Sequence, residues 1–219
     1  MAQLKFIHGA ISGRLGELVG SSWKGINYIK TYSKPANPRT EGQISIRLVF
    51  RKISQWATAL FKTGLLSLIP PARRMTPRNS VFAANKKMFT EKIFSAETLQ
   101  VASANLPVSI FGLQCDHTGG RFLFQGGFAF APNSPAVSAV AHGLVYDSVN
   151  GNIVAYANSP IADNIIINSE ESSFGGNVSN EYLSEDVLSN CRFYVFISAV
   201  DTDNKLLLSE TLSADVAIN

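Results

Sequence analysis

The sequence predicts an α+β protein with an N-terminal β-hairpin arm, then two helices, then an immunoglobulin- or fibronectin-like antiparallel β-sandwich. Apolar residues recur at helical spacing between residues 41 and 94 and in short strand-like runs from residue 105 onward. Charge divides the chain in the same way. Residues 1–94 carry sixteen Lys or Arg and three Glu, whereas residues 95–219 carry three Lys or Arg and thirteen Asp or Glu. We therefore expect two domains, a basic one at 1–100 and an acidic one at 101–219, facing different partners or each other in neighbouring copies.

Length and composition favour a folded protein made in the cytoplasm. With 219 residues and 46% hydrophobic residues, the chain can bury a sizeable core. The first twenty residues include Lys5, Arg14 and Glu17 and no uninterrupted apolar run, so we expect no secretory signal. No stretch approaches the roughly 20 apolar residues of a membrane span, and no membrane partner is expected. Cys115 and Cys191 are expected to be free thiols.

The arm is expected to be a glycine-rich hairpin. Leu15 to Gly20 and Trp23 to Tyr32 are its predicted strands, with the turn at Ser21-Ser22. Pro35 and Pro38 then end the ladder and make an extended connector. The glycines of this segment are expected to allow tight turns or the close approach of another chain; they are Gly13, Gly16, Gly20 and Gly25.

Two helices are expected after the connector. Thr40-Glu41-Gly42-Gln43 has the pattern of a capping box, so a helix should begin near Glu41 and continue to Gly64, with apolar positions Val49, Ile53, Trp56 and Leu60. A second helix is predicted from Ser80 to about Phe94. A basic loop joins the two and contains Arg73, Arg74 and Arg78.

The C-terminal half contains about seven predicted strands, a number and spacing typical of a sandwich. Asn150-Gly151 is expected to form a type I′ turn, and Asp203-Asn204 to join the last two strands. The predicted strands are Leu106–Leu113, Arg121–Phe130, Val137–Tyr146, Asn152–Ala157, Asn164–Asn168, Arg192–Val200 and Lys205–Leu212.

The N-terminal signature from Gly13 to Gly25, GRLGELVGSSWKG, is followed by Asn37-Pro38-Arg39-Thr40, Gln43 and Arg47. With it, the chain resembles an uncharacterised protein family of Bacteroidota and their phages, including phages of the crAss-like group. This resemblance implies no activity and no catalytic residues. It does imply a virion component, such as a head-to-tail connector, ring or tail protein.

No group of residues has the spacing of a catalytic, cofactor or metal site. His8, His117 and His142 are far apart, and no Glu or Cys stands at helical spacing from them. Asp201 to Asn204 reads as a polar turn, and the Ser-rich stretch 169–173 as a solvated loop. Phosphate-loop and nucleophile-elbow motifs are also absent from the sequence. We therefore expect no enzyme activity, no cofactor and no metal.

The basic half predicts contact with either another protein chain or nucleic acid. Cations interleaved with aromatic residues suit both phosphate contact with base stacking and an acidic protein surface. We favour contact between subunits, because the acidic half supplies a complementary surface. The predicted contact residues are Arg14, Trp23, Lys24, Tyr28, Lys30, Lys34, Arg39, Arg47, Arg51, Lys52, Arg73, Arg74 and Arg78.

The hypothesis drawn from the sequence is therefore a homo-oligomeric virion protein, made in the host cytoplasm. Its partners would be further copies of itself, neighbouring virion proteins and, non-specifically, DNA. One alternative is a nucleic-acid-binding accessory protein that uses the basic half. Another, suggested only by the sandwich, is a bacterial surface adhesion module.

Overall fold

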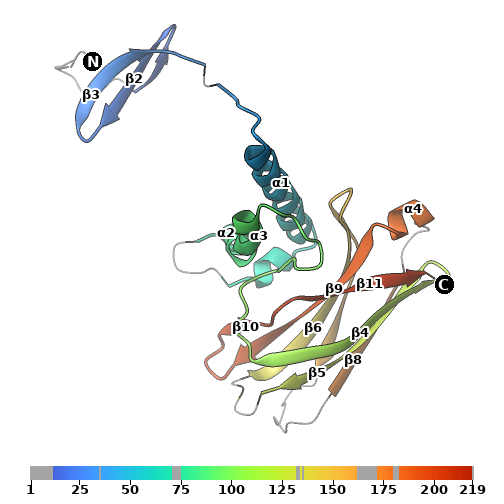
Figure 1. Cartoon of the computed structure of the whole chain (residues 1–219). Helices are drawn as coiled ribbons and strands as arrows, with labels where there is room; N and C mark the ends of the chain where they lie inside the picture. Colours follow the sequence, from blue (N-terminus) through green and yellow to red (C-terminus); the bar gives the residue numbers. More distant parts are fainter. Residues whose placement is uncertain are drawn as a thin grey trace. The chain divides into compact units, whose positions relative to one another are not determined.

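The computed structural model of the chain describes residues 12–34, 36–70, 75–131, 134, 136–161, 172–179 and 183–218. The chain divides into two compact units, residues 1–40 and 41–219. Below, the described part of the first unit is called the arm and the second unit is called the body (Figure 1).

The arm is a three-stranded antiparallel sheet in the order β1-β2-β3. Its strands are β1 (Gly13–Leu15), β2 (Leu18–Trp23) and β3 (Ile26–Thr31). The predicted turn at Ser21-Ser22 is wrong, because both serines lie within β2, opposite Tyr28 and Asn27.

The real turns of the arm are Gly16-Glu17 and Lys24-Gly25. Lys24 (φ 47°) and Gly25 (φ 79°) both have positive φ. That is the requirement of the two-residue type I′ turn, which twists with its strands. Glycine adopts this backbone without strain, and it is glycine rather than serine that sets the turn.

The body begins with the predicted long helix. The helix from Glu41 to the Gly64 region is confirmed: α1 spans Glu41–Lys62, and Gly64 takes φ 78° just before a short 3-10 helix. The helical segments of the body are α1 (Glu41–Lys62), η1 (Leu65–Leu68), α2 (Pro77–Ala84), α3 (Lys86–Glu91) and α4 (Glu185–Leu188).

The second predicted helix is two helices instead of one. α2 ends and α3 begins at Asn85, which has non-helical φ and ψ of −96° and 18°. Its side-chain amide donates to the carbonyl oxygens of Val81 (2.8 Å) and Gln100 (2.8 Å). These bonds stabilise a break that apolar periodicity does not reveal. α3 then ends at Lys92, whose φ is 58°, before the predicted end at Phe94.

Eight strands form the sandwich. Seven follow the order β7-β6-β9-β11-β4-β5-β8, and β10 pairs with β9. β11 joins the two halves, because its first residues pair antiparallel with β9 and its last residues pair parallel with β4. The strands are β4 (Val108–Thr118), β5 (Arg121–Phe130), β6 (Ala136–Asp147), β7 (Asn152–Ile161), β8 (Ser172–Ser179), β9 (Cys191–Asp201), β10 (Leu206–Leu208) and β11 (Leu212–Ile218).

The body has two hydrophobic cores, one on each side of the β6–β9 sheet. Along β9, Phe193, Val195 and Ile197 face the interior of the sandwich, where Phe193 meets Phe124 of β5 with ring centroids 5.1 Å apart. Tyr194 and Phe196 point the other way, into a core shared with the helices. β9 is therefore buried on both faces, which explains its nearly unbroken apolar sequence. Figure 1 shows α1, α2 and α3 together on one side of the strands.

Several predicted strands are confirmed, and some details are corrected. β5 and β9 match their predicted spans within a residue or two, and the loop Asp203-Asn204 does connect β9 to β10. The type I′ turn at Asn150-Gly151 is wrong. β6 and β7 are joined by a four-residue loop, in which Gly151 has positive φ (72°) and Asn150 does not.

Other predicted spans differ from the structure. The expected last strand is β10 followed by the separate strand β11. β8 begins at Ser172, inside the stretch expected to be a loop. The predicted strand Asn164–Asn168 lies outside the described residues.

The helices and the sandwich form one compact unit, although the sequence suggested a boundary near residue 100. The boundary between units lies at Thr40 and Glu41. The physical reason is the shared core, in which Trp56 of α1 meets Tyr146 of β6 and Tyr194 of β9 at centroid distances of 4.8 and 5.1 Å. Residue 100 marks a change from helix to strand within the body.

Trp56→Ala should lower the free energy of unfolding of the body by about 3–5 kcal/mol, because Trp56 is fully buried and its Nε1 donates to the Gln100 carbonyl oxygen. Phe61→Ala is the matched control on the same helix. Phe61 is 70% exposed, so its change should stay within about 0.5 kcal/mol. Chemical denaturation measures both; equal effects would contradict the shared core.

Candidate subunit interface

The strand register of the arm gathers its aromatic and basic residues on one face. Residues paired across antiparallel strands share a face. The register pairs Arg14 with Val19, Val19 with Lys30, Ser21 with Tyr28, and Trp23 with Ile26. Tyr32 follows at the same spacing after Lys30. This surface is called the aromatic–basic face and consists of Arg14, Val19, Ser21, Trp23, Ile26, Tyr28, Lys30 and Tyr32.

Two cations stack on rings of this face. The Arg14 guanidinium lies 3.9 Å from the Tyr32 ring centroid, and its Nε donates to the Gly16 carbonyl oxygen at 2.8 Å. Lys24 Nζ lies 4.8 Å from the ring of Trp23. Trp23 is nevertheless 64% exposed. A cation held over an exposed ring presents charge and apolar area to a partner together.

The opposite face of the arm is also partly apolar. It carries Leu18 and Ile29, while Gly13 and Gly20 face each other across β1 and β2. Within the described part of the arm, no large hydrophobic side chain is fully buried. A three-stranded sheet needs a covered apolar face for stability, and this one shows apolar side chains on both.

The remaining predicted contact residues fall into three groups. Lys34 and Arg39 of the connector are exposed, as are Arg47 and Arg51 of α1. Lys52 instead donates to the Ser148 carbonyl oxygen at 2.5 Å. Arg73 and Arg74 lie outside the described residues.

Arg78 serves the body rather than a partner. Its guanidinium donates to Ser54 Oγ at 2.8 Å and to Thr58 Oγ1 at 3.3 Å. These bonds tie α2 to α1, so Arg78, like Lys52, is accounted for by internal contacts.

The first turns of α1 form a second exposed apolar surface that sequence reasoning missed. Ile44, Ile46, Leu48 and Phe50 are each between 40% and 57% exposed. They point in different directions around the helix, whereas only Val49 of this stretch is buried. Exposed apolar side chains grouped on a surface are candidates for contact with a partner. The sequence pattern that could have revealed this surface is the segment from Ile44 to Phe50, where apolar residues occur outside the row of positions that face the core.

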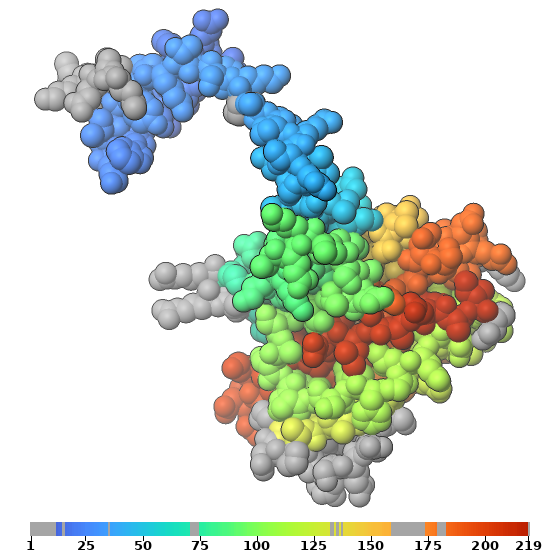
Figure 2. All heavy atoms as spheres, viewed as in Figure 1, coloured from blue at the N-terminus to red at the C-terminus, as the bar shows by residue number. Residues whose placement is uncertain are grey.

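An acidic cleft opens on the body where α3, the segment of residues 95–100 and the start of β11 meet. Its volume is about 400 Å³. Glu91 of α3, Glu97 of the segment and Glu210, two residues before β11, line the cleft, and Met88 and Leu212 supply apolar surface. Lys87 stands beside Glu91 at 3.7 Å. Figure 2 shows the green helical segment lying against the dark red C-terminal strands on this side of the body.

The floor of the cleft is a hydrogen-bonded network of amides. Asn85 Oδ1 accepts from the Gln100 backbone N–H at 2.9 Å. Gln100 in turn uses its side chain as a peptide mimic, donating to the Thr211 carbonyl oxygen (3.0 Å) and accepting from the Thr211 N–H (2.9 Å). Satisfied networks of this kind are rigid. The cleft is therefore a formed feature of the body.

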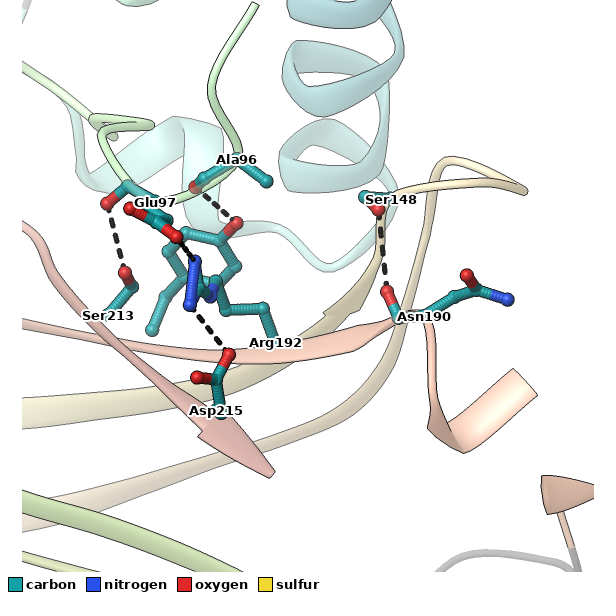
Figure 3. Close-up of polar contacts among 8 residues, drawn as sticks. Ala96, Glu97, Ser148, Asn190, Arg192, Ser213 and Asp215 are labelled. Carbon is teal, nitrogen blue, oxygen red and sulfur yellow. Dashed lines mark hydrogen bonds and ion pairs between the residues drawn. The ribbon is translucent and has the colours of Figure 1, made fainter. Parts of the chain in front are cut away.

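An ion-pair cluster fixes one wall of the cleft (Figure 3). The Arg192 guanidinium lies between Glu97 (3.1 Å) and Asp215 (2.6 Å). Tyr194 Oη donates to the Ala96 carbonyl oxygen at 2.6 Å, and Ser213 Oγ donates to that of Glu97 at 2.9 Å. The Glu97 carboxylate is therefore held by its ion pair with Arg192. Glu210 is the cleft carboxylate with most freedom to contact a partner.

A buried histidine cluster has the geometry of a nucleophile and its base. His142 Nε2 lies 2.7 Å from Ser198 Oγ, and Nδ1 lies 3.0 Å from Tyr156 Oη. The ring stacks on Phe196 with centroids 4.7 Å apart. Burial lowers the pKa of His142 to about 4, and Ser198 is only 6% exposed. Because the His142 ring is neutral, buried and hydrogen-bonded at both nitrogens, we assign the cluster a role in the packing of the body and not in catalysis.

The two cysteines are buried rather than placed in loops. Cys115 lies in β4 and Cys191 begins β9, both in the sandwich core. Burial raises the pKa of each thiol to about 12. His117 is also in β4 and packs against Phe122.

Among the described residues, no group of three or more His, Cys, Asp or Glu is placed to hold a metal ion. No helix within the same residues is long and apolar enough to cross a membrane.

The sequence of residues 10–102 matches a family of unknown function, DUF6266. The similarity to an uncharacterised family is thus confirmed over this part of the chain. The matched segment contains the arm and the helices α1 to α3, and it ends just before the sandwich. None of the curated proteins compared with the chain matches it.

Solved structures similar to the body are β-rich domains of low identity. The C-terminal domain of wzt shares 12% identity with a TM-score of 0.41, covering 57% of this chain and 80% of its own. A domain of the outer membrane lipoprotein Omp28 from Porphyromonas gingivalis shares 9% identity with a TM-score of 0.34, covering 53% of this chain and 94% of its own. Neither name bears on the function of this chain.

Acid should destabilise the body through His142. The unfolded chain binds a proton near pH 6.5, whereas folded His142 resists it until about pH 4, so stability falls as pH drops between these values. The loss should reach about 3 kcal/mol. His142→Gln should remove this part of the pH dependence, as followed by urea unfolding from pH 7 to pH 4.

Tyr156→Phe is the matched control. This substitution removes the hydrogen bond to His142 and leaves the imidazole ring buried. It should lower the free energy of unfolding by about 1 kcal/mol at every pH, and the change of stability with pH should stay as in the wild type. A wild-type slope in His142→Gln would contradict the assignment.

Proposed function

We propose that the chain is a self-assembling structural protein whose arm packs against a neighbouring copy. The observation that carries the proposal is the arm itself, a sheet of three short strands with apolar side chains exposed on both faces. The body, by contrast, has two complete cores. A small sheet of this kind needs another surface to cover its apolar side chains, and grouped exposed apolar residues mark interaction sites.

Assembly accounts for both faces of the arm better than folding back on one body does. A flat sheet that docks on a single surface leaves its other face in water. The first turns of α1, directly after the connector, also expose apolar side chains on several sides. Several surfaces without a cover in one region favour contact with more than one neighbour, as in a ring or a stack of subunits.

The connector gives the arm the reach to find a neighbour. Residues 33, 34 and 36–40 form no helix or strand and are exposed. A segment of eight residues, the length from 33 to 40, can span at most about 28 Å when fully extended. The arm can therefore extend toward another copy.

The setting we propose is a phage particle, in which the protein forms a ring or connector of the head-to-tail or tail assembly. Support for this setting comes from the resemblance of the N-terminal signature. Catalysis is not part of the proposal, because the nucleophile-like pair found among the described residues, His142 and Ser198, is buried.

We also infer that the sandwich is immunoglobulin-like. Its first strand pairs with its second, and its second with its fifth, as strands A, B and E do in that fold. β6 pairs with β7 and β9, and β9 pairs with β11, as C, C′, F and G do. The pairing order supports the assignment, although the tryptophan and disulfide of antibody domains are absent from the sequence of this half.

Nucleic-acid binding is the second candidate, favoured by the way Arg14, Trp23, Tyr28, Lys30 and Tyr32 share one face. Aromatic rings beside cations suit single-stranded nucleic acid. Titration with single-stranded DNA at rising salt separates the two candidates. Tight binding that weakens steeply with salt, together with assembly only when DNA is present, would favour this one.

The test of assembly is the mass of the nuclease-treated, full-length protein by light scattering at low and high salt. We expect a discrete oligomer. Trp23→Ser with Ile26→Ser should raise the concentration needed for assembly by at least about tenfold, because the pair contributes much of the exposed apolar area of the face.

The matched control replaces two exposed apolar residues of the body, Leu123→Ser with Val149→Ser. It should assemble as wild type does. A wild-type chain that stays monomeric under every condition would refute the proposed function.

A further inference from the structure

We propose that the aromatic–basic face of one copy docks on the acidic cleft of a second copy. The proposal rests on the assembly function proposed above and names the surface that receives the arm. Its basis is a double match, in charge and in apolar character, between two described surfaces of the same chain.

The arm and the cleft carry opposite charge. Between residues 12 and 40 the chain carries five cations and one acidic residue, Glu17. Lys30 and Lys34 are exposed. The cleft presents Glu91, Glu97 and Glu210 within one opening. Opposite charges at the rim of an interface select the partner and its register.

Other acidic groups of the body are less suited to receive the arm. Asp147 is buried and accepts from the backbone of its own loop, including the Val149 N–H at 2.8 Å. Asp201 accepts from the Asp203 and Lys205 N–H groups of its turn. Asp215 does not line the cleft, and it is paired with Arg192.

The apolar match concerns the walls of the cleft and the exposed aromatic side chains of the arm, with Trp23 at one end of the aromatic–basic face and Tyr32 at the other. Met88 and Leu212 line the cleft beside the carboxylates. On the arm, Trp23 and Tyr32 are exposed next to stacked cations. An opening of about 400 Å³ accepts one or two large side chains, not a whole strand. The flat sheet would therefore lie on the rim and insert side chains into the cleft.

The rigid floor makes the cleft a suitable receptor. Asn85, Gln100 and Thr211 satisfy one another through paired amide hydrogen bonds. A preformed pocket costs less ordering free energy on binding than one that must form. Glu210 stands directly before Thr211 in this network, so its backbone position is fixed while its side chain is exposed.

A charge-swap experiment on full-length protein tests the contact. The cleft variant is Glu91→Lys with Glu210→Lys, which spares Glu97 and its pair with Arg192. The arm variant is Lys30→Glu with Lys34→Glu, which spares the stacked Arg14 and Lys24. Each should raise the concentration for assembly by at least about 100-fold, because like charges then face each other.

The four-substitution variant, which carries both swaps, should assemble within about threefold of the wild-type concentration, since opposite charges meet again. The control Glu185→Lys with Asp203→Lys makes the same change in charge elsewhere on the body and should assemble normally. Thermal melting checks that every variant keeps a folded body.

The outcomes separate the two proposals. If wild type assembles and the cleft variant assembles equally well, or if the four-substitution variant is not rescued, docking on the cleft is refuted and assembly stands. If wild type itself is monomeric, the proposed function fails and the docking with it. Loss in each double variant with rescue in the combined one would establish the contact.

Discussion

Burial of the β6–β9 sheet on both faces is the constraint on which the body depends. Phe193 and Val195 face the interior of the sandwich, while Tyr194 and Phe196 face the helices. A sheet buried on one side only would leave the aromatic row of β9 in water. The helices are therefore a third layer of the body, and α1 to α3 cannot be removed without exposing that row.

The arm is under the opposite constraint, because none of its described large hydrophobic side chains is fully buried. Its turns and register are well defined, with Lys24 and Gly25 in the backbone that a tight turn needs, yet Trp23 on one face and Leu18 on the other are largely exposed. Local backbone rules thus specify the shape of the arm, while its stability must come from contacts with something else. This difference between arm and body is the physical reason to assign assembly to the arm.

The sequence predicts the parts of this protein whose signal is local and fails where a distant contact decides. The span of α1 follows from its apolar stripe and from Gly64, and β9 from a run of apolar residues. The break at Asn85 could not be predicted, because it depends on a hydrogen bond to Gln100, fifteen residues further on. The prediction of a turn at Ser21-Ser22 is wrong because serine is common in turns, whereas the actual turn depends on a lysine, Lys24, that adopts positive φ.

The candidate site shows the same limit. The contact set was chosen by residue type, and the structure divides it: Lys52 and Arg78 bond within the body, whereas Arg14, Trp23 and Lys30 share one face of the arm. Which cations share a face depends on strand register, and a turn misplaced by a few residues changes it. The cleft was beyond prediction, since Glu91 and Glu210 are 119 positions apart in the sequence and meet only through the layering of helices on the sheet.

The extent of the family match bears on how these parts work together. Residues 10–102 include the arm, the connector, α1 to α3 and the irregular segment that carries Glu97 and Gln100. Two of the three cleft carboxylates therefore lie in the matched segment, together with the face proposed to meet them. Glu210 and Thr211 come from the sandwich and complete the cleft from outside that segment. The paired hydrogen bonds between Gln100 and Thr211 join the matched segment to the sandwich. The sandwich therefore holds one wall of the cleft in place. The other walls, and the arm proposed to dock there, come from the N-terminal half.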